Sequence, residues 1–247
     1  MSDQLIRTRM LIGDDPIERI KKSKVAVFGV GGVGGYCVEA MARAGLGSMD
    51  LYDDDTVSES NLNRQIAALH STIGLPKAQV MADRVRDINP GCQVRAIRMF
   101  YLPGNAEQVE LAQYDYVIDC IDTVAAKLDL VQRCTRLNVP IISAMGSGNK
   151  LDPTAFVVTD ISKTEGCPLA RIMRKELRKR GIEHLKVVYS RELPRSPIQS
   201  AQAELPVDCD TRPGSTARRD TPGSISFVPA AAGLVLASAV LRDIGQF

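Results

Sequence analysis

Apolar runs and amphipathic stretches alternate along the first 150 residues of this chain. Five short runs, several of them rich in β-branched residues, predict buried strands at residues 24–29, 49–53, 92–99, 115–122 and 139–146. Helical spacing of apolar residues predicts helices at residues 34–47, 75–90 and 127–138. This order of strands and helices is typical of a mostly parallel, doubly wound sheet. The predicted fold class is therefore α/β and Rossmann-like.

The pattern changes after Lys150. One amphipathic helix is predicted to end at Gly181, with Leu169, Ile172, Met173 and Leu177 on its apolar side. Residues from about 190 to 224 are rich in Pro, Ser and Arg, which predicts a long mobile loop. We therefore expect a Rossmann-like domain over residues 1–160 and an extension over 161–247. The extension consists of a basic helix, the loop and an apolar helix, and we expect it to pack on the same core.

An uncharged stretch at residues 221–241 is long enough to cross a bilayer. Pro222 and Pro229 shorten its continuous helix to about residues 229–243, which favours a buried core or dimer helix over a membrane span. Arg7 and Arg9 interrupt the N-terminus before any apolar run, so no signal peptide is expected. Together these features predict a cytoplasmic protein with no membrane span.

The charge is unevenly distributed although the net charge is only +2. Residues 1–160 hold 17 Lys+Arg and 20 Asp+Glu, a balance of −3, whereas residues 161–247 hold 14 and 9, a balance of +5. This basic excess predicts an anionic partner for the C-terminal part. None of the six cysteines lies in a C-x-x-C pair, so the sequence gives no support for a zinc site.

A glycine loop follows the first predicted strand and opens the first helix. Residues 29–34 read GVGGVG and match G-x-G-x-x-G. Gly29 permits the tight turn, Gly31 lets phosphate oxygens approach backbone N–H groups, and Gly34 lets the helix pack on the strand. Asp53 ends the second strand, where it can accept hydrogen bonds from ribose hydroxyls. These residues predict a nucleotide site, but they do not choose between NAD, FAD and ATP.

Three charged residues favour ATP. Lys77 lies in the first turn of a helix, where a cation opposes the helix macrodipole unless an anion binds there. Arg64 lies within reach of a phosphate tail, and an Arg with a Lys suits a triphosphate better than the two phosphates of NAD. Asp122 ends the fourth strand at the carboxyl edge, and a carboxylate beside a polyphosphate indicates Mg²⁺. The alternative for each, taken alone, is a surface charge or salt bridge.

Several motifs together resemble the ubiquitin-activating-type adenylyltransferases. They are GxGGVG, then D-x-D-x-V-x-x-S-N-x-x-RQ, then a lysine twelve residues after the glutamine, then DCxD. The resemblance implies a homodimer in which an N-terminal arginine, Arg7 or else Arg9, reaches the partner's ATP site. It also implies that Gly29, Gly31, Gly32 and Gly34 line the nucleotide site, that Asp53 binds ribose, that Asn61, Arg64, Gln65 and Lys77 hold the ATP phosphates, and that Asp122 binds Mg²⁺.

The remaining chain is similar to one branch of that family, the tRNA threonylcarbamoyladenosine dehydratases. The similar stretches include NRQIAALHSTIGLPKAQVM, RDINPGCQV, SAMGSGNKLDPTAFVVTDISKT and FVPAAAGLVLAS, so the resemblance covers nearly everything except residues 190–222. It implies ATP-dependent cyclisation of the modified adenosine beside the anticodon. In this reading Arg64, Lys77 and Asp122 are the catalytic residues, and a sulfur-relay or cysteine desulfurase system is a further expected partner.

Some members of this branch carry a cysteine just before the C-terminal apolar helix. This chain has Gly223 and Ser224 there, so a covalent cysteine mechanism at that place is not supported. Cys167 and Cys209 remain candidate nucleophiles. The reaction does not require one, because the attacking ureido group is already tethered to the carboxylate that is activated.

The extension carries the basic residues that tRNA binding needs. Those assigned to tRNA are Arg171, Arg174, Lys175, Arg178 and Lys179, with Arg180 and the loop residues Arg191, Arg195, Arg218 and Arg219 beside them. A solvated basic helix face is the alternative. Three other functions stay open on the sequence: adenylation of a protein C-terminus, a non-catalytic nucleotide-binding scaffold, and an NAD oxidoreductase.

Overall fold

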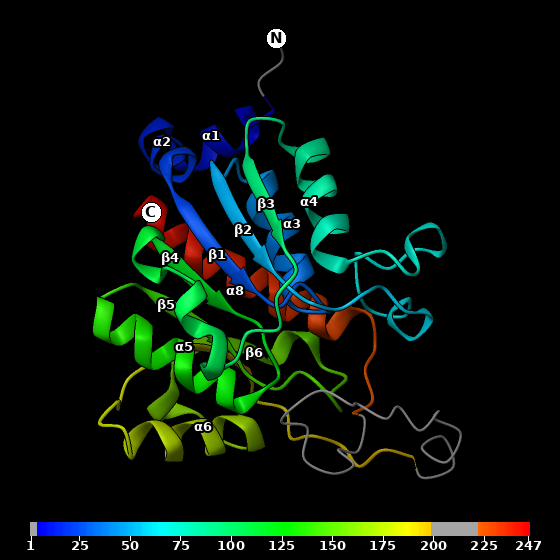
Figure 1. The fold of residues 1–247 in the computed structure, drawn as a ribbon, viewed down its shortest axis with the longest axis vertical. Helices are drawn as coiled ribbons and strands as arrows, with labels where there is room; N and C mark the ends of the chain where they lie inside the picture. Colours follow the sequence, from blue (N-terminus) through cyan, green and yellow to red (C-terminus); the bar gives the residue numbers. More distant parts are fainter. Residues whose placement is uncertain (1–3, 199–221) are drawn as a thin grey trace.

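The computed structural model describes residues 4–198 and 222–247, and it has a single mixed sheet at its centre (Figure 1). Within these residues the sheet has seven strands in the order β3-β2-β1-β4-β5-β7-β6. In that order the strands are Gln93–Ile97, Ser48–Tyr52, Lys24–Phe28, Tyr116–Asp119, Ile141–Ala144, Lys186–Ser190 and Phe156–Asp160. All neighbouring pairs are parallel except β6 with β7. The strand order reverses between β1 and β4, where ligands bind in doubly wound folds.

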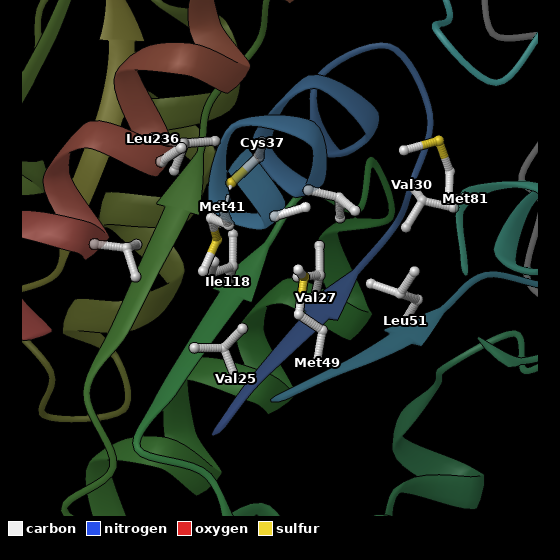
Figure 2. Close-up of a cluster of buried hydrophobic side chains, with 14 of the residues drawn as sticks. Val25, Val27, Val30, Cys37, Met41, Met49, Leu51, Met81, Ile118 and Leu236 are labelled. Carbon is white, nitrogen blue, oxygen red and sulfur yellow. Dashed lines mark hydrogen bonds between the residues drawn. The ribbon is translucent and has the colours of Figure 1, made fainter. Parts of the chain in front are cut away.

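Helices cover both faces of the sheet. The chain also forms α1 (Ile6–Ile12), α2 (Asp14–Lys22), α3 (Gly34–Arg43), α4 (Lys77–Ile88), α5 (Val124–Leu137), α6 (Pro168–Arg178) and α8 (Phe227–Gly245). On one face, Val25 and Val27 of β1 pack with side chains of α3, α4 and α8, as Figure 2 shows for Met41, Met81 and Leu236. On the other face, alternate strand residues pack against α5 and the segment from 101 to 114. The sequence-based fold class is confirmed.

The sequence did not predict the strands β7 and β6, which form one edge of the sheet. The KVVYS run of β7 is short and follows a charged helix, and β6 lies in a stretch without helices that would mark a βαβ unit. β7 inserts between β5 and β6, so the extension expected over residues 161–247 supplies an inner strand of the same sheet. On α6 one apolar assignment is wrong: Ile172 is exposed, and Ala170 joins Met173 and Leu177 in the buried face.

Helix α8 begins two residues before the expected start and passes through Pro229 without a break. By length and composition it is apolar enough to cross a bilayer, and somewhat less than half of it is buried against the rest of the chain. The buried side includes Val228, Leu236 and Val240, which contact the main core. Leu234, on the other side, is half exposed.

Gly233 allows α8 to lie directly against α3. A Cβ atom at this position would lie 2.3 Å from the Val33 carbonyl oxygen and 2.9 Å from the Cβ of Tyr36. The Gly233→Ala variant is therefore expected to lose about 1–3 kcal/mol of unfolding free energy, the usual cost of overpacking. Denaturant unfolding of the purified variant measures this loss.

The matched control is Gly104→Ala, because a Cβ atom there would have no neighbour within 4 Å. It is expected to change stability by less than about 0.5 kcal/mol. Equal stability losses in the two variants would show that the close approach of α8 to α3 is not what restricts position 233.

A candidate nucleotide site at the carboxyl edge of the sheet

The glycine loop is packed so tightly against its own protein that two of its glycines are required by the fold. Gly29 has a left-handed backbone (φ +84°), and a Cβ atom there would lie 2.9 Å from the Cys120 carbonyl oxygen. A Cβ atom at Gly34 would lie 1.8 Å from the Gly29 carbonyl oxygen. Both glycines therefore allow the loop, the end of β4 and the start of α3 to pack closely against one another.

At Gly31, by contrast, no contact within the described part of the chain requires a glycine. Its nearest neighbour is the Gln65 side chain, at 3.7 Å from the position of a Cβ atom, which is ordinary contact. A glycine that the fold does not need is expected where a ligand approaches the backbone closely. The Oε1 atom of Gln65 is buried and has no hydrogen-bond partner among the described residues, so it is ready to accept a donor from a ligand.

Asp53 lies just past β2 and orients the glycine loop. Its Oδ2 accepts a hydrogen bond from the Val30 N–H at 2.8 Å, and its Oδ1 accepts one from the Asp55 N–H at 2.9 Å. Burial raises the pKa of this carboxyl above its ordinary value, against the opposing effect of the Val30 N–H and Lys77. A carboxylate that accepts two backbone hydrogen bonds still has lone pairs for ribose hydroxyls.

The segment after Asp53 brings Asn61 and Arg64 to the same loop. Asn61 is buried, and its Oδ1 accepts a hydrogen bond from the Ser58 N–H, which closes a short turn. Arg64 is half buried, and its Cγ lies 3.7 Å from where a Cβ of Gly32 would be. Burial lowers the pKa of the Arg64 guanidinium, so a nearby anion would be favourable to it.

Lys77 is the first residue of α4 and is almost fully buried. Its Nζ forms an ion pair with Asp55 Oδ2 at 2.9 Å. Sequence reasoning expected Lys77 to face a phosphate and did not foresee this partner. Asp55 thus holds the ammonium group next to Asp53, in the same cluster of residues that contacts the glycine loop.

Asp122 lies in an exposed loop three residues beyond β4, rather than at the strand end that the sequence predicted. Its nearest recorded partner is the Thr123 hydroxyl, which donates to Oδ1 at 3.3 Å. The carboxylate is therefore accessible. Asp53, Asp54 and Asp55 form a second group of carboxylates whose oxygens lie within 4.8 Å of one another, so oxygen ligands suited to Mg²⁺ occur on both sides of the glycine loop.

A buried ion pair beneath the Asp122 loop was missed by the sequence analysis. Lys127 Nζ lies 2.8 Å from Asp119 Oδ2, and neither side chain has any exposed surface. Lys127 also donates to the Ile121 carbonyl at 3.0 Å, and the Ile121 N–H donates to Asp119 Oδ1 at 3.1 Å. The Ser143 hydroxyl of β5 donates to the same carboxylate. The signal in the sequence was a lone lysine on the apolar side of a helix.

The two N-terminal arginines lie away from this edge. Helix α1 lies near the amino ends of the strands, where Leu5 contacts Gly45 (Figure 1). Arg7 is exposed, and Arg9 pairs with Asp14. Neither is brought to the site of its own chain, so a role for Arg7 in a second copy's site stays a prediction.

The cysteine candidates do not form a reactive site in the described residues. Cys167 is buried at the N-cap of α6, with its Sγ 3.9 Å from where a Cβ of Gly146 would be. Cys209, Arg218, Arg219 and most of the expected loop lie outside the described residues. No role for either cysteine follows from the structure.

The basic helix α6 presents only part of the expected tRNA-binding set. Arg171, Lys175 and Arg178 are exposed. Lys179 and Arg180 are paired with Glu176. Arg174 is half buried and donates to the carbonyl and hydroxyl oxygens of Thr164, so it holds the turn before α6 and is a poor candidate for RNA contact.

These contacts are typical of a nucleotide-binding protein with a doubly wound sheet. Comparison with known proteins identifies the family to which the chain belongs. The model of the ThiF family matches residues 3–247, and the chain belongs to this family. It is 42% identical over 245 residues to the tRNA threonylcarbamoyladenosine dehydratase of Bacillus subtilis, covering 99% of this chain and 95% of that protein. It is 37% identical over 139 residues to the sulfur carrier protein ThiS adenylyltransferase of Escherichia coli, covering 56% and 55% of the two chains.

A solved structure shares the whole architecture. The crystal structure of E. coli tRNA N6-threonylcarbamoyladenosine dehydratase, TcdA, in complex with ATP superposes with a TM-score of 0.84 at 34% identity, covering 98% of this chain and 93% of that one. The resemblance found in the sequence is confirmed at the level of family and fold.

A substitution in the buried pair of Lys127 and Asp119 tests how much this pair stabilises the fold around the site. Lys127→Met keeps the unbranched apolar part of the side chain but leaves the Asp119 charge buried without its ammonium partner. Removing one partner of a buried pair typically costs about 3–5 kcal/mol, and we expect a loss of that size in denaturant unfolding. The exposed pair Lys21–Glu18 is the control: Lys21→Met should cost less than about 1 kcal/mol. Equal effects would contradict a special role for the buried pair.

Proposed function

We propose that this chain is an ATP-dependent tRNA threonylcarbamoyladenosine dehydratase, which cyclises N6-threonylcarbamoyladenosine next to the anticodon. The observation that carries the proposal is the glycine loop with the three side chains that surround it. The space beside Gly31 is not filled by the part of the protein that the structure describes, and Gln65 offers a buried acceptor without a partner among the described residues. Asp53 accepts a hydrogen bond from the Val30 N–H, and Arg64 lies against Gly32. The similarity to dehydratases along the full chain supports the choice of substrate.

The chemistry begins with activation of a carboxylate. The free carboxylate of the threonylcarbamoyl group attacks the α-phosphate of ATP, and pyrophosphate leaves with its electron pair. The ureido oxygen of the same side chain then attacks the activated acyl carbon, a proton leaves the ureido nitrogen, and AMP departs with one carboxylate oxygen. The net change in the nucleoside is the loss of one water. Because the attacking group is tethered, proximity supplies much of the acceleration.

In this proposal the protein positions the reactants and stabilises negative charge. Arg64 and Lys77 lie on the polyphosphate, where charge develops as pyrophosphate leaves. Asp53 holds the ribose, and Asn61 and Gln65 bind ATP together with Arg64 and Lys77. Mg²⁺, when it binds with ATP, neutralises phosphate charge, and Asp122 is its proposed ligand because the carboxylate is accessible at the carboxyl edge.

The tRNA is proposed to bind along α6. Its exposed cations Arg171, Lys175 and Arg178 supply a phosphate-binding face, and the exposed Arg191 and Arg195 extend it beyond β7. We further propose a cytoplasmic homodimer in which Arg7 reaches the partner's ATP site, together with a sulfur-relay partner. The exposed apolar residues Met10 and Leu11 of α1 support the dimer, because a second copy would cover them.

Nucleoside analysis tests the reaction directly. The purified protein is incubated with ATP, Mg²⁺ and tRNA that carries threonylcarbamoyladenosine, and the nucleosides are examined by mass spectrometry under mild conditions. We expect ATP-dependent loss of one water from that nucleoside. Arg64→Ala should slow the reaction by about 10²-fold or more, as removal of a group that stabilises developing charge usually does.

The control variant is Arg136→Ala, which removes an exposed arginine in the last turn of α5. It should react at the rate of the natural chain. An unchanged nucleoside with ATP still bound would contradict the proposal and favour adenylation of another carboxylate, such as a protein C-terminus.

A charge-reversal variant tests the RNA face. Changing Arg171, Lys175 and Arg178 to Glu is expected to weaken tRNA binding and to reduce the slope of log affinity against log salt by about 2–3, since each lost phosphate contact removes roughly one unit. Filter binding across a salt series measures both quantities.

The control reverses Lys21, Lys22 and Arg86, which lie on α2 and α4 far from α6 (Figure 1) and change the net charge by the same amount. An equal loss from both triple variants would mean that only net charge matters, and the α6 face would be rejected.

A further inference from the structure

A short segment ahead of α8 ties together two loops that are distant in the sequence. This bridging segment is Pro222–Ser224. The Asn63 side chain donates through Nδ2 to the Ser224 carbonyl at 3.0 Å. Asn149 makes a two-sided contact with Gly223: its N–H donates to the Gly223 carbonyl at 2.8 Å, and its Oδ1 accepts from the Gly223 N–H at 2.7 Å. Two consecutive residues of the segment are therefore each held by an asparagine.

The two asparagines belong to loops on either side of the nucleotide site. Asn63 follows β2, and Asn149 follows β5. In the sheet order β2-β1-β4-β5, the strands between them carry the glycine loop and the Asp122 loop. Carboxyl ends of parallel strands meet at one edge, so the bridging segment connects the two flanks of the site. Pro229, a few residues further on, lies 3.3 Å from where a Cβ of Gly32 would be.

Asn63 is also the partner of Arg64. The Arg64 Nη1 donates to Asn63 Oδ1 at 2.8 Å and to the Ser60 carbonyl at 2.8 Å. Among the described residues both hydrogen bonds of this guanidinium use Nη1, which leaves Nε and Nη2 free to bind an anion. The amide of Asn63 is thus satisfied on both sides, by Arg64 through its oxygen and by Ser224 through its nitrogen.

Asn149 has further contacts besides its pair of hydrogen bonds with Gly223. It has a left-handed backbone (φ 59°), a conformation that asparagine tolerates better than most residues. Its carbonyl accepts a hydrogen bond from the Arg195 N–H at 2.8 Å, and a Cβ atom at the preceding Gly148 would lie 2.7 Å from Pro222. The β5 loop is therefore a rigid anchor, and the chain of contacts runs from Asn149 through Gly223 and Ser224 to Asn63 and Arg64.

We propose that Asn63 is a positioning residue for Arg64 in ATP binding, and that Asn149 acts on Arg64 through the bridging segment. The proposal rests on the function proposed above, in which Arg64 meets the phosphates of ATP. The hydrogen bonds hold the guanidinium in the direction in which its remaining donors face an anion. Without them a flexible arginine loses rotamer freedom when it binds, which weakens the interaction.

Nucleotide binding without tRNA tests this proposal. Calorimetry gives the affinity for ATP, and ligand-observed NMR titration gives the affinity for adenosine, which lacks phosphates. Asn63→Ala and Asn149→Gly are each expected to weaken ATP binding about 3- to 10-fold, the effect of one lost hydrogen bond, and to leave adenosine binding unchanged. Glycine retains the left-handed backbone at position 149, so this variant removes only the side-chain contact.

Two further variants make the test specific. Because both asparagines act through one chain of contacts, the double variant should bind ATP no more weakly than the weaker single variant. Asn149→Asp keeps the oxygen that accepts from Gly223 and should bind ATP like the natural chain.

Arg64→Ala separates the two proposals. If it weakens ATP binding selectively while the asparagine variants do not, the positioning role is overturned and the proposed function stands. Equal weakening of ATP and adenosine in the asparagine variants would also overturn it, because that is the signature of general disruption. If Arg64→Ala itself leaves ATP binding unchanged, the proposed function fails at its phosphate site and the positioning role fails with it.

Discussion

The buried ion pair between Lys127 and Asp119 is the interaction on which the geometry of the site depends. Two charges with no exposed surface are costly unless each finds several hydrogen-bond partners, and here the partners are the backbone of Ile121 and the hydroxyl of Ser143. The pair therefore joins α5 to the ends of β4 and β5. It also fixes the turn at Cys120 and Ile121. The backbone of this turn lies against Gly29, so the pair helps to position the glycine loop at the end of the sheet.

The other functional segments all contact the glycine loop. Asp53 holds its Val30 N–H, Gln65 lies beside Gly31, and Arg64 and Pro229 both approach Gly32. Segments from three parts of the chain thus contact three consecutive residues of the loop, 30 to 32. The C-terminal helix belongs to this arrangement because Gly233 lets α8 lie on α3, which places Pro229 at the loop. The C-terminal part of the chain thus supplies Pro229 beside the glycine loop and β7 to the same sheet.

Most of this arrangement could be predicted from the sequence wherever a residue's role depends on local pattern. The buried runs of β1, β2, β4 and β5 and the glycine spacing identified the fold and the loop. Contacts between distant segments could not be predicted, because spacing carries no information about them. Lys77 with Asp55, Asn63 with Ser224, and Asn149 with Gly223 are of this kind. The strand β7 was missed although α6 precedes it, because β6 comes between β5 and α6 and breaks the simple alternation of strands and helices.

An isotope measurement tests most directly whether this edge of the sheet activates a carboxylate with ATP. The threonylcarbamoyl carboxylate of the tRNA is prepared with both oxygens as ¹⁸O, and the products of one turnover are analysed by mass spectrometry. The account predicts AMP that carries one ¹⁸O atom, because the carboxylate oxygen that attacks the α-phosphate leaves with AMP. Label in inorganic phosphate or in water, with unlabelled AMP or none, would contradict it.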